Sequence, residues 1–308
     1  MAKKAAAVKQ WLENRNRFAN FFNARIFNGV QIIKPDELEP VDGETHIQIK
    51  DMEEKTQEIH RYRDITMRWK GEMDLMILAC ENQDKIHYAM PVQTMIYDGL
   101  SYVQQMKLMW DLREKDEKIT ADEFLSKFRK EDKICPVITV VLYLGEEEWD
   151  ASVDLYGLFN IENTLRENEN LKNYIPNYKI NLVDGTRLDN LELFQEDLRI
   201  VFGLLKCRKD KNRLKEYIEE NSDYFSEMDI ETGMVVGSFI NSERIVKMVE
   251  SKKKGEGVDM CKALEDWAIE EQEKKAIEIA KNLLNVLEIE VIAEKVGLPI
   301  EVIKGLQE

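Results

Sequence analysis

The sequence predicts an α/β protein of the α+β kind, with a mixed sheet flanked by helices and a mainly helical C-terminal half. Three observations predict it. Residues 61–83 contain two extended segments around a turn, residues 136–145 form a β-branched apolar run that ends in glycine, and strand signals largely stop after residue 149. The order helix, strands, helix, strand is typical of a mixed sheet with helices on its faces.

The composition is typical of a globular protein with a very polar surface. The 308 residues carry a formal net charge of −16, which argues against wholesale adhesion to nucleic acid but allows a local basic patch or a metal-bridged phosphate contact. No apolar run approaches the roughly 20 residues that span a bilayer, so no membrane partner is expected. The basic N-terminus lacks an apolar signal core, and the four cysteines are widely spaced. We therefore expect reduced thiols and a cytoplasmic location.

The expected elements follow from periodicity and from turn residues. In chain order they are a helix over 8–25, a short strand at 30–33, a surface loop over 36–58, strands at 61–69 and 74–83, a helix over 89–112, a short amphipathic helix within 113–133, a strand at 136–145, helices over 190–209, 211–221 and 230–250, a linker at 251–257, a helix over 261–288 and two short helices around 297–299. Three domains follow, with a core at 1–160, a helical extension at 161–250 and a C-terminal helical tail at 251–308.

The two strands in 61–83 predict a polar site. A turn near Gly71 brings Asp64 within a residue or two of facing Glu81, and Glu81 shares a strand face with Gln83. A carboxylate at the end of a buried strand is costly unless it is paired or holds a cation. Two interpretations stay open at this point: a strand that becomes polar where it meets water, and a metal site.

Two further segments also have two interpretations. The basic residues within 206–215 fit a solvated helix end, or a patch that contacts phosphates. The tail around 289–306 has the turn glycine and apolar spacing of a helix-turn-helix, but its second helix has little basic character. Packing or homo-oligomerisation suits the tail as well as DNA reading does.

Several motifs follow one another along the chain: R-D, E-N-Q, H-Y-A-M-P-V-Q-T-M-I-Y-D-G-L-S-Y-V-Q-Q, D-K-I-C-P-V-I-T-V-V-L-Y-L-G-E-E-E-W-D and the tail I-A-E-K-V-G-L-P-I-E-V-I. In this order they resemble the Rpn family of recombination-promoting nucleases, also labelled putative transposases, within the PD-(D/E)xK nuclease superfamily. The resemblance implies a restriction-endonuclease-like core. It also implies a Mg²⁺-dependent DNA endonuclease associated with recombination or mobile elements.

Single residues have expected roles, of which the resemblance implies those of Asp64, Glu81, Gln83, Gln93, Tyr97 and Gln105, and the chemistry of a metal and phosphate site adds those of Asn82, Arg61 and Arg63. The catalytic residues are Asp64, Glu81 and Gln83; the metal ligands are Asp64, Glu81 and the backbone oxygen of Asn82; the DNA-binding or pocket residues are Arg61, Arg63, Gln93, Tyr97 and Gln105. Two positions depart from the pattern of the relatives, Gln93 where relatives often carry arginine and Asn20 where near relatives often carry aspartate. Gln83 stands where the wider superfamily usually has lysine, but E-x-Q is the common form in this family.

These residue types suit phosphodiester hydrolysis. A divalent cation neutralises the phosphate and lowers the pKa of its bound water. Mg²⁺ prefers oxygen ligands, and the amide of Gln83 can orient water although it brings no charge. DNA is then the expected partner. The alternative is a catalytically degenerate nuclease-fold protein that acts as a DNA- or protein-binding module.

Overall fold

The structure is a computed structural model, and it describes residues 2–41, 44–50, 56–62, 64–70, 76–113, 119–252, 257–284 and 286–306. For residues 44–50, 56–62, 76–79 and 81 the description covers the backbone. The chain forms two compact units, Met1–Phe202 and Gly203–Glu308. Each is described by itself below.

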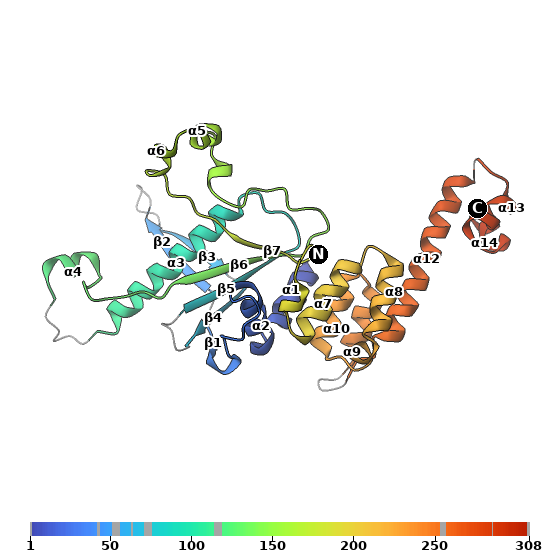
Figure 1. Cartoon of the computed structure of the whole chain (residues 1–308), viewed down its shortest axis with the longest axis horizontal. Helices are drawn as coiled ribbons and strands as arrows, with labels where there is room; N and C mark the ends of the chain where they lie inside the picture. Colours follow the sequence, from blue (N-terminus) through green and yellow to red (C-terminus); the bar gives the residue numbers. More distant parts are fainter. Residues whose placement is uncertain are drawn as a thin grey trace. The chain divides into compact units, whose positions relative to one another are not determined.

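A five-stranded mixed sheet lies at the centre of the first unit (Figure 1). Its strands, in spatial order, are β1 (Leu38–Pro40), β4 (Ile65–Trp69), β5 (Met76–Gln83), β6 (Val137–Tyr143) and β7 (Asn181–Asp184). The pairs β1–β4 and β4–β5 are antiparallel, whereas β5–β6 and β6–β7 are parallel. The predicted mixed sheet is therefore confirmed. A separate antiparallel hairpin joins β2 (Glu44–Lys50) and β3 (Thr56–Tyr62).

The first unit also contains helices, some beside this sheet and some on segments that leave it (Figure 1). They are α1 (Ala2–Leu12), α2 (Arg15–Ile26), α3 (Met90–Asp111), α4 (Ala121–Ser126), α5 (Glu162–Glu167) and α6 (Glu169–Lys172), with short 3-10 turns at Pro35–Glu37, Tyr156–Leu158 and Leu191–Leu193. One helix was expected over 8–25, but the structure has two, because α1 ends at Leu12 and α2 begins at Arg15. The side chain of Asn14 accepts hydrogen bonds from the backbone N–H groups of Asn16 and Arg17, and so begins a new helix there.

The two faces of the sheet are covered by different helices. Ile65, Met67 and Trp69 share one face of β4, and the Trp69 ring packs against Phe27, directly after α2. On β6, Thr139 donates a hydrogen bond to Asp98 of α3. The strand register aligns Thr139 with Ala79, and Ala79 with Thr66. α3 therefore covers the face that carries Thr66, opposite to the face of Trp69.

Two sequence predictions about strands are wrong, and one strand was not predicted. Residues 30–33 form no strand. The side-chain amide of Asn23 forms hydrogen bonds with the backbone N–H groups of Ile32 and Ile33 and with the carbonyl of Ile33, so these groups do not pair with another strand. Residues 36–58 are not one loop, since they include β1 and β2 and the start of β3. β7 was not expected, because its four residues become a strand only by pairing with β6. Because β7 belongs to the sheet, the sheet extends beyond residue 160, the predicted end of the core.

The second unit is helical, as predicted for the C-terminal half. Its helices are the end of α7 (Glu196–Cys207), α8 (Lys211–Glu220), α9 (Ser222–Ser226), α10 (Ile230–Phe239), α11 (Glu243–Glu250), α12 (Cys261–Leu283), α13 (Ile289–Val296) and α14 (Ile300–Gly305). Gly297 ends α13 with a φ of 71°, a conformation that favours glycine. Within the described residues, none of the helices is both long and apolar enough to cross a membrane.

Candidate metal and phosphodiester site

The strand pair β4–β5 carries the candidate site. Its antiparallel register runs from Trp69 opposite Met76 to Ile65 opposite Cys80. The next position along each backbone is Asp64 on one side and Glu81 on the other. The Oδ2 atom of Asp64 accepts a hydrogen bond from the backbone N–H of Asn82 at 2.7 Å. The side chain of Asp64 is therefore held at the C-terminal end of β5.

The local sequence explains why Asp64 lies at this end. Ile65, Met67 and Trp69 are 4%, 2% and 2% exposed, so burial of alternate side chains fixes the face of β4. The indole Nε1 of Trp69 donates to Glu37 at 2.9 Å, and this hydrogen bond lowers the pKa of that carboxyl. A shift of one residue would turn these three side chains to the opposite face of the sheet, so their packing fixes the face on which Asp64 and Thr66 lie.

The Asp64 carboxylate is half-buried and largely uncompensated. Burial raises its pKa, because desolvation disfavours the charged form. The hydrogen bond from Asn82 and the charge of Lys9 act in the opposite direction but do not cancel this effect. The ionised side chain is therefore held in an unfavourable place, and a bound cation would offset that cost.

Two buried polar atoms of this strand pair, Thr66 Oγ1 and Asn82 Nδ2, have no hydrogen-bond partner among the residues whose side chains are described. Strand alternation places Thr66 on the face of Asp64, whereas Asn82 lies on the opposite face, where its Oδ1 accepts from the thiol of Cys80 at 3.7 Å. The group at this strand end that fits Mg²⁺ is therefore the carboxylate of Asp64, because Mg²⁺ prefers oxygen ligands and keeps several waters.

For Glu81, the second predicted carboxylate, the structure gives only the position of the backbone. Glu81 pairs with Val141 of β6, and its side chain lies outside the described part of the structure. Among the described residues, no group of three or more His, Cys, Asp or Glu side chains is placed to hold a metal ion. The assignment of Asp64, Glu81 and Asn82 as metal ligands stays a prediction.

The two arginines and Gln83 have different positions. The predicted strand 61–69 is wrong as one element, because it is divided between β3 and β4; Arg61 lies on β3, where its backbone pairs with Thr45. Arg63 lies outside the described residues. Gln83 is the last residue of β5, and its carbonyl oxygen accepts from the N–H of Leu144 at 2.7 Å. Its half-buried side chain stands at the strand end, as the sequence predicts.

The three residues of α3 that were predicted to bind DNA or line a pocket fall into two groups. The amide Nε2 of Gln93 donates to the hydroxyl of Tyr97 at 3.3 Å, and Tyr97 is 8% exposed. Gln105 is farther along the helix. Its Nε2 donates to the carbonyl of Cys135 at 3.1 Å, and its Oε1 accepts from the N–H of Cys135 at 2.7 Å. Gln105 therefore anchors the approach to β6, which is a positioning role.

A buried network on the α3 face has no clear signal in the sequence. Asp98 is 6% exposed and accepts hydrogen bonds from the hydroxyls of Thr139 and Tyr178. Tyr178 is 80 residues away along the chain, so no local pattern connects the two. The departure at Asn20 also has a structural explanation, since its Oδ1 accepts from the N–H of Gln195 at 3.2 Å.

One comparison with known proteins gives a match. Residues 115–232 match a family model described as "Putative transposase, YhgA-like". The match covers a little more than a third of the chain, includes β6 and β7, and begins after β4 and β5. No curated protein and no solved structure matches the chain significantly. The chain is therefore similar to that family over its middle part, and the match does not reach Asp64 or Glu81.

Proposed function

We propose that this protein is a Mg²⁺-dependent DNA endonuclease whose site lies at the C-terminal end of β5. The observation that carries the proposal is the register of β4 and β5, with Asp64 fixed by the N–H of Asn82 next to position 81. The order of strands, antiparallel on one side of β5 and parallel on the other, supports a restriction-endonuclease-like core. The family match supports an association with mobile elements, because its description names transposases.

Each residue has a role in this proposal. Asp64 and Glu81 would hold the metal, together with the backbone oxygen of Asn82. When bound, the metal would supply charge neutralisation at the phosphate and a water of lowered pKa. Gln83 would orient the attacking water through its amide, since the half-buried strand end limits how that side chain can move. Gln93 and Tyr97 would line the pocket from α3, and Arg61 and Arg63 would contact the DNA.

The test is cleavage of supercoiled plasmid DNA by the whole protein, with Mg²⁺ and with chelator. We expect cleavage with Mg²⁺ only, and loss of cleavage in Glu81→Ala. Glu39→Ala is the matched control, because Glu39 is an acid of the same sheet that pairs with Lys70 at the surface. Full activity of Glu81→Ala, or cleavage that persists in chelator, would contradict the proposal.

One observation favours a second candidate, a nuclease-fold protein that binds DNA or protein without cutting. The two residues that differ from the pattern of the relatives, Asn20 and Gln93, both form hydrogen bonds inside the protein. Asn20 accepts from the backbone N–H of Gln195, and Gln93 donates to the hydroxyl of Tyr97. Binding of Mn²⁺ and duplex DNA without cleavage, under conditions that support related nucleases, would select this candidate over the first.

A further inference from the structure

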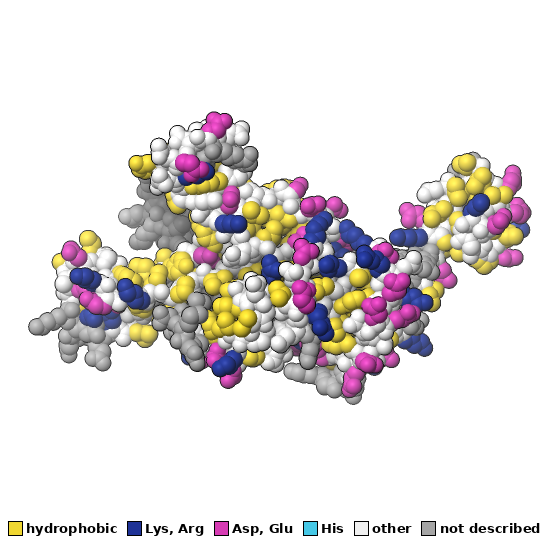
Figure 2. All heavy atoms as spheres, in the orientation of Figure 1, with side chains coloured by type: hydrophobic (Ala, Val, Ile, Leu, Met, Phe, Trp, Pro, Cys, Tyr) yellow, Lys and Arg dark blue, Asp and Glu magenta, His cyan; other side chains and the backbone are white. Residues whose placement is uncertain are grey.

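The C-terminal half of α3 and the segment that follows it form an arm, defined here as residues 102–113 and 119–134. From Tyr102 onward no residue of α3 is fully buried. Large apolar side chains lie on the arm's surface, and Figure 2 shows them gathered there. Their exposed fractions are Val103 56%, Leu108 48%, Leu112 74%, Phe124 62% and Leu125 84%. Exposed apolar side chains that cluster in this way mark protein interaction sites.

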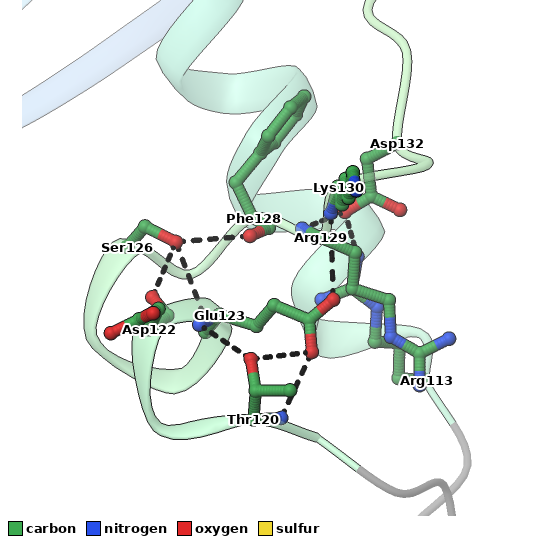
Figure 3. Close-up of polar contacts among 9 residues, drawn as sticks. All are labelled: Arg113, Thr120, Asp122, Glu123, Ser126, Phe128, Arg129, Lys130 and Asp132. Carbon is green, nitrogen blue, oxygen red and sulfur yellow. Dashed lines mark hydrogen bonds and ion pairs between the residues drawn. The ribbon is translucent and has the colours of Figure 1, made fainter.

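Local hydrogen bonds stabilise the α4 part of the arm (Figure 3). Thr120 and Glu123 form a reciprocal capping box at the start of α4. The hydroxyl of Ser126 lies 2.8 Å from the carbonyl oxygen of Asp122 and 2.9 Å from that of Phe128, so its one proton is donated to either of them. These contacts favour one backbone conformation around Phe124 and Leu125, which lowers the entropy that a partner must offset on binding.

Ion pairing and ring packing connect α4 to the end of α3. Arg113 forms an ion pair with Asp132, and Asp132 also accepts from the N–H of Arg129 at 2.7 Å. The ring of Phe124 lies edge-on to Trp110 at 6.2 Å. Lys127 Nζ covers both rings, 4.7 Å from the Trp110 centroid and 3.8 Å from the Phe124 centroid. Phe124 is thus fixed on one side and exposed on the other.

The charge of the arm indicates its partner. The chain carries −16, so two copies repel each other over most of their surfaces. Residues 119–134 contain equal numbers of basic and acidic side chains, Lys127, Arg129, Lys130 and Lys133 against Asp122, Glu123, Glu131 and Asp132. This balanced rim around an apolar centre is self-complementary, because each copy offers both signs to the other. An acidic or a basic partner would leave half of these charges opposed.

We propose that the arm is the interface of a homodimer, with Phe124 and Leu125 of one copy packed against the arm of a second copy. A two-fold axis brings the same patch of both chains together, as in most soluble dimers. Exposed apolar anchors at the centre of a polar rim are the arrangement found at binding hot spots. The inference is independent of whether the protein cuts DNA.

Sedimentation equilibrium of the full chain, over a series from about 1 to about 100 µM, tests this proposal. We expect a monomer–dimer equilibrium whose dissociation constant rises at least about tenfold in Leu125→Asp. Tyr174→Asp is the matched control, because Tyr174 is also 84% exposed, and it should leave the equilibrium unchanged.

Two results would overturn the proposal. One is a wild-type protein that stays monomeric throughout the series, which would leave a different protein as the occupant of the arm. The other is a dimer that Leu125→Asp does not weaken, for example one that Val286→Asp in the C-terminal tail dissociates instead. Circular dichroism melting of each variant checks that the exposed substitution has not unfolded the chain.

Discussion

The end of β5 and the α3–α4 arm depart from ordinary packing in opposite ways. At β5 a half-buried carboxylate and unpartnered polar atoms lie inside the protein. On the arm Thr120, Ser126 and Asp132 have hydrogen-bond partners, and large apolar side chains lie outside. Each departure costs stability in the isolated chain and is offset by a different kind of ligand. A polar interior suits a cation and a phosphate, whereas an apolar exterior suits another protein surface.

Replacement of the β5 carboxylate gives the largest expected effect. Asp64→Asn keeps an oxygen that can accept from the N–H of Asn82, but it removes the charge that would hold Mg²⁺. We expect plasmid cleavage to fall at least about 100-fold. Leu125→Asp on the arm serves as the control and should cut at the wild-type rate when substrate is saturating. Wild-type cleavage by Asp64→Asn would end the comparison, because the polar interior would then have no catalytic role.

Gln105 separates anchoring from pocket function on α3. Gln105→Ala removes both hydrogen bonds to the backbone of Cys135, and we expect a loss of about 1–2 kcal/mol of unfolding free energy. The neighbour Gln104 is exposed, so Gln104→Ala should change stability little. Urea denaturation of both variants measures the difference. Unchanged stability together with weaker DNA binding would instead make Gln105 a pocket residue.

The capping box tests whether rigidity of the arm matters. Thr120→Ala removes the side chain that accepts from the N–H of Glu123, which costs about 1 kcal/mol of local helix stability. We expect a rise of a few-fold in the dimer dissociation constant and no change in DNA cleavage. Thr164→Ala on α5, an exposed threonine, should alter neither quantity. A cleavage defect in Thr120→Ala would show that the two regions are coupled.

The smallest effect is the pH dependence of stability at Asp64. Burial raises the pKa of this carboxyl, so the folded protein holds the proton more tightly than the unfolded chain does. Stability is therefore lost as pH rises from the unfolded pKa through the folded one. Asp64→Asn should be at least as stable as wild type at pH 7 without metal, and the difference should shrink as the pH falls.

Melting temperatures without metal across this pH range supply the measurement. A less stable Asp64→Asn at pH 7 would mean that the carboxylate stabilises the fold through its hydrogen bond from Asn82. The end of β5 would then not be a place where burial of a charge costs stability. Addition of Mg²⁺ should raise the melting temperature of wild type but not that of Asp64→Asn, because binding to the folded state alone stabilises it.

Some of this protein is determined by local sequence. The continuous apolar runs predict β5 and β6 as strands covered on both faces, and the helical spacing of apolar side chains predicts α3. The proximity of Asp64 and Glu81 along the backbone was also predictable, since an antiparallel pair with a short connection fixes which residues face each other. The chemistry of these two residues stays a prediction.

Other features exist only in the tertiary structure. β7 is a strand because it pairs with the edge of β6. The buried carboxylate of Asp98 accepts a hydrogen bond from Tyr178, which is 80 residues away along the chain. The arm depends on a contact between the end of α3 and residues that follow α4, so the sequence predicts two helices but not which apolar side chains stay exposed. Periodicity reports which side chains can be buried together, and only the folded chain decides which of them find a partner.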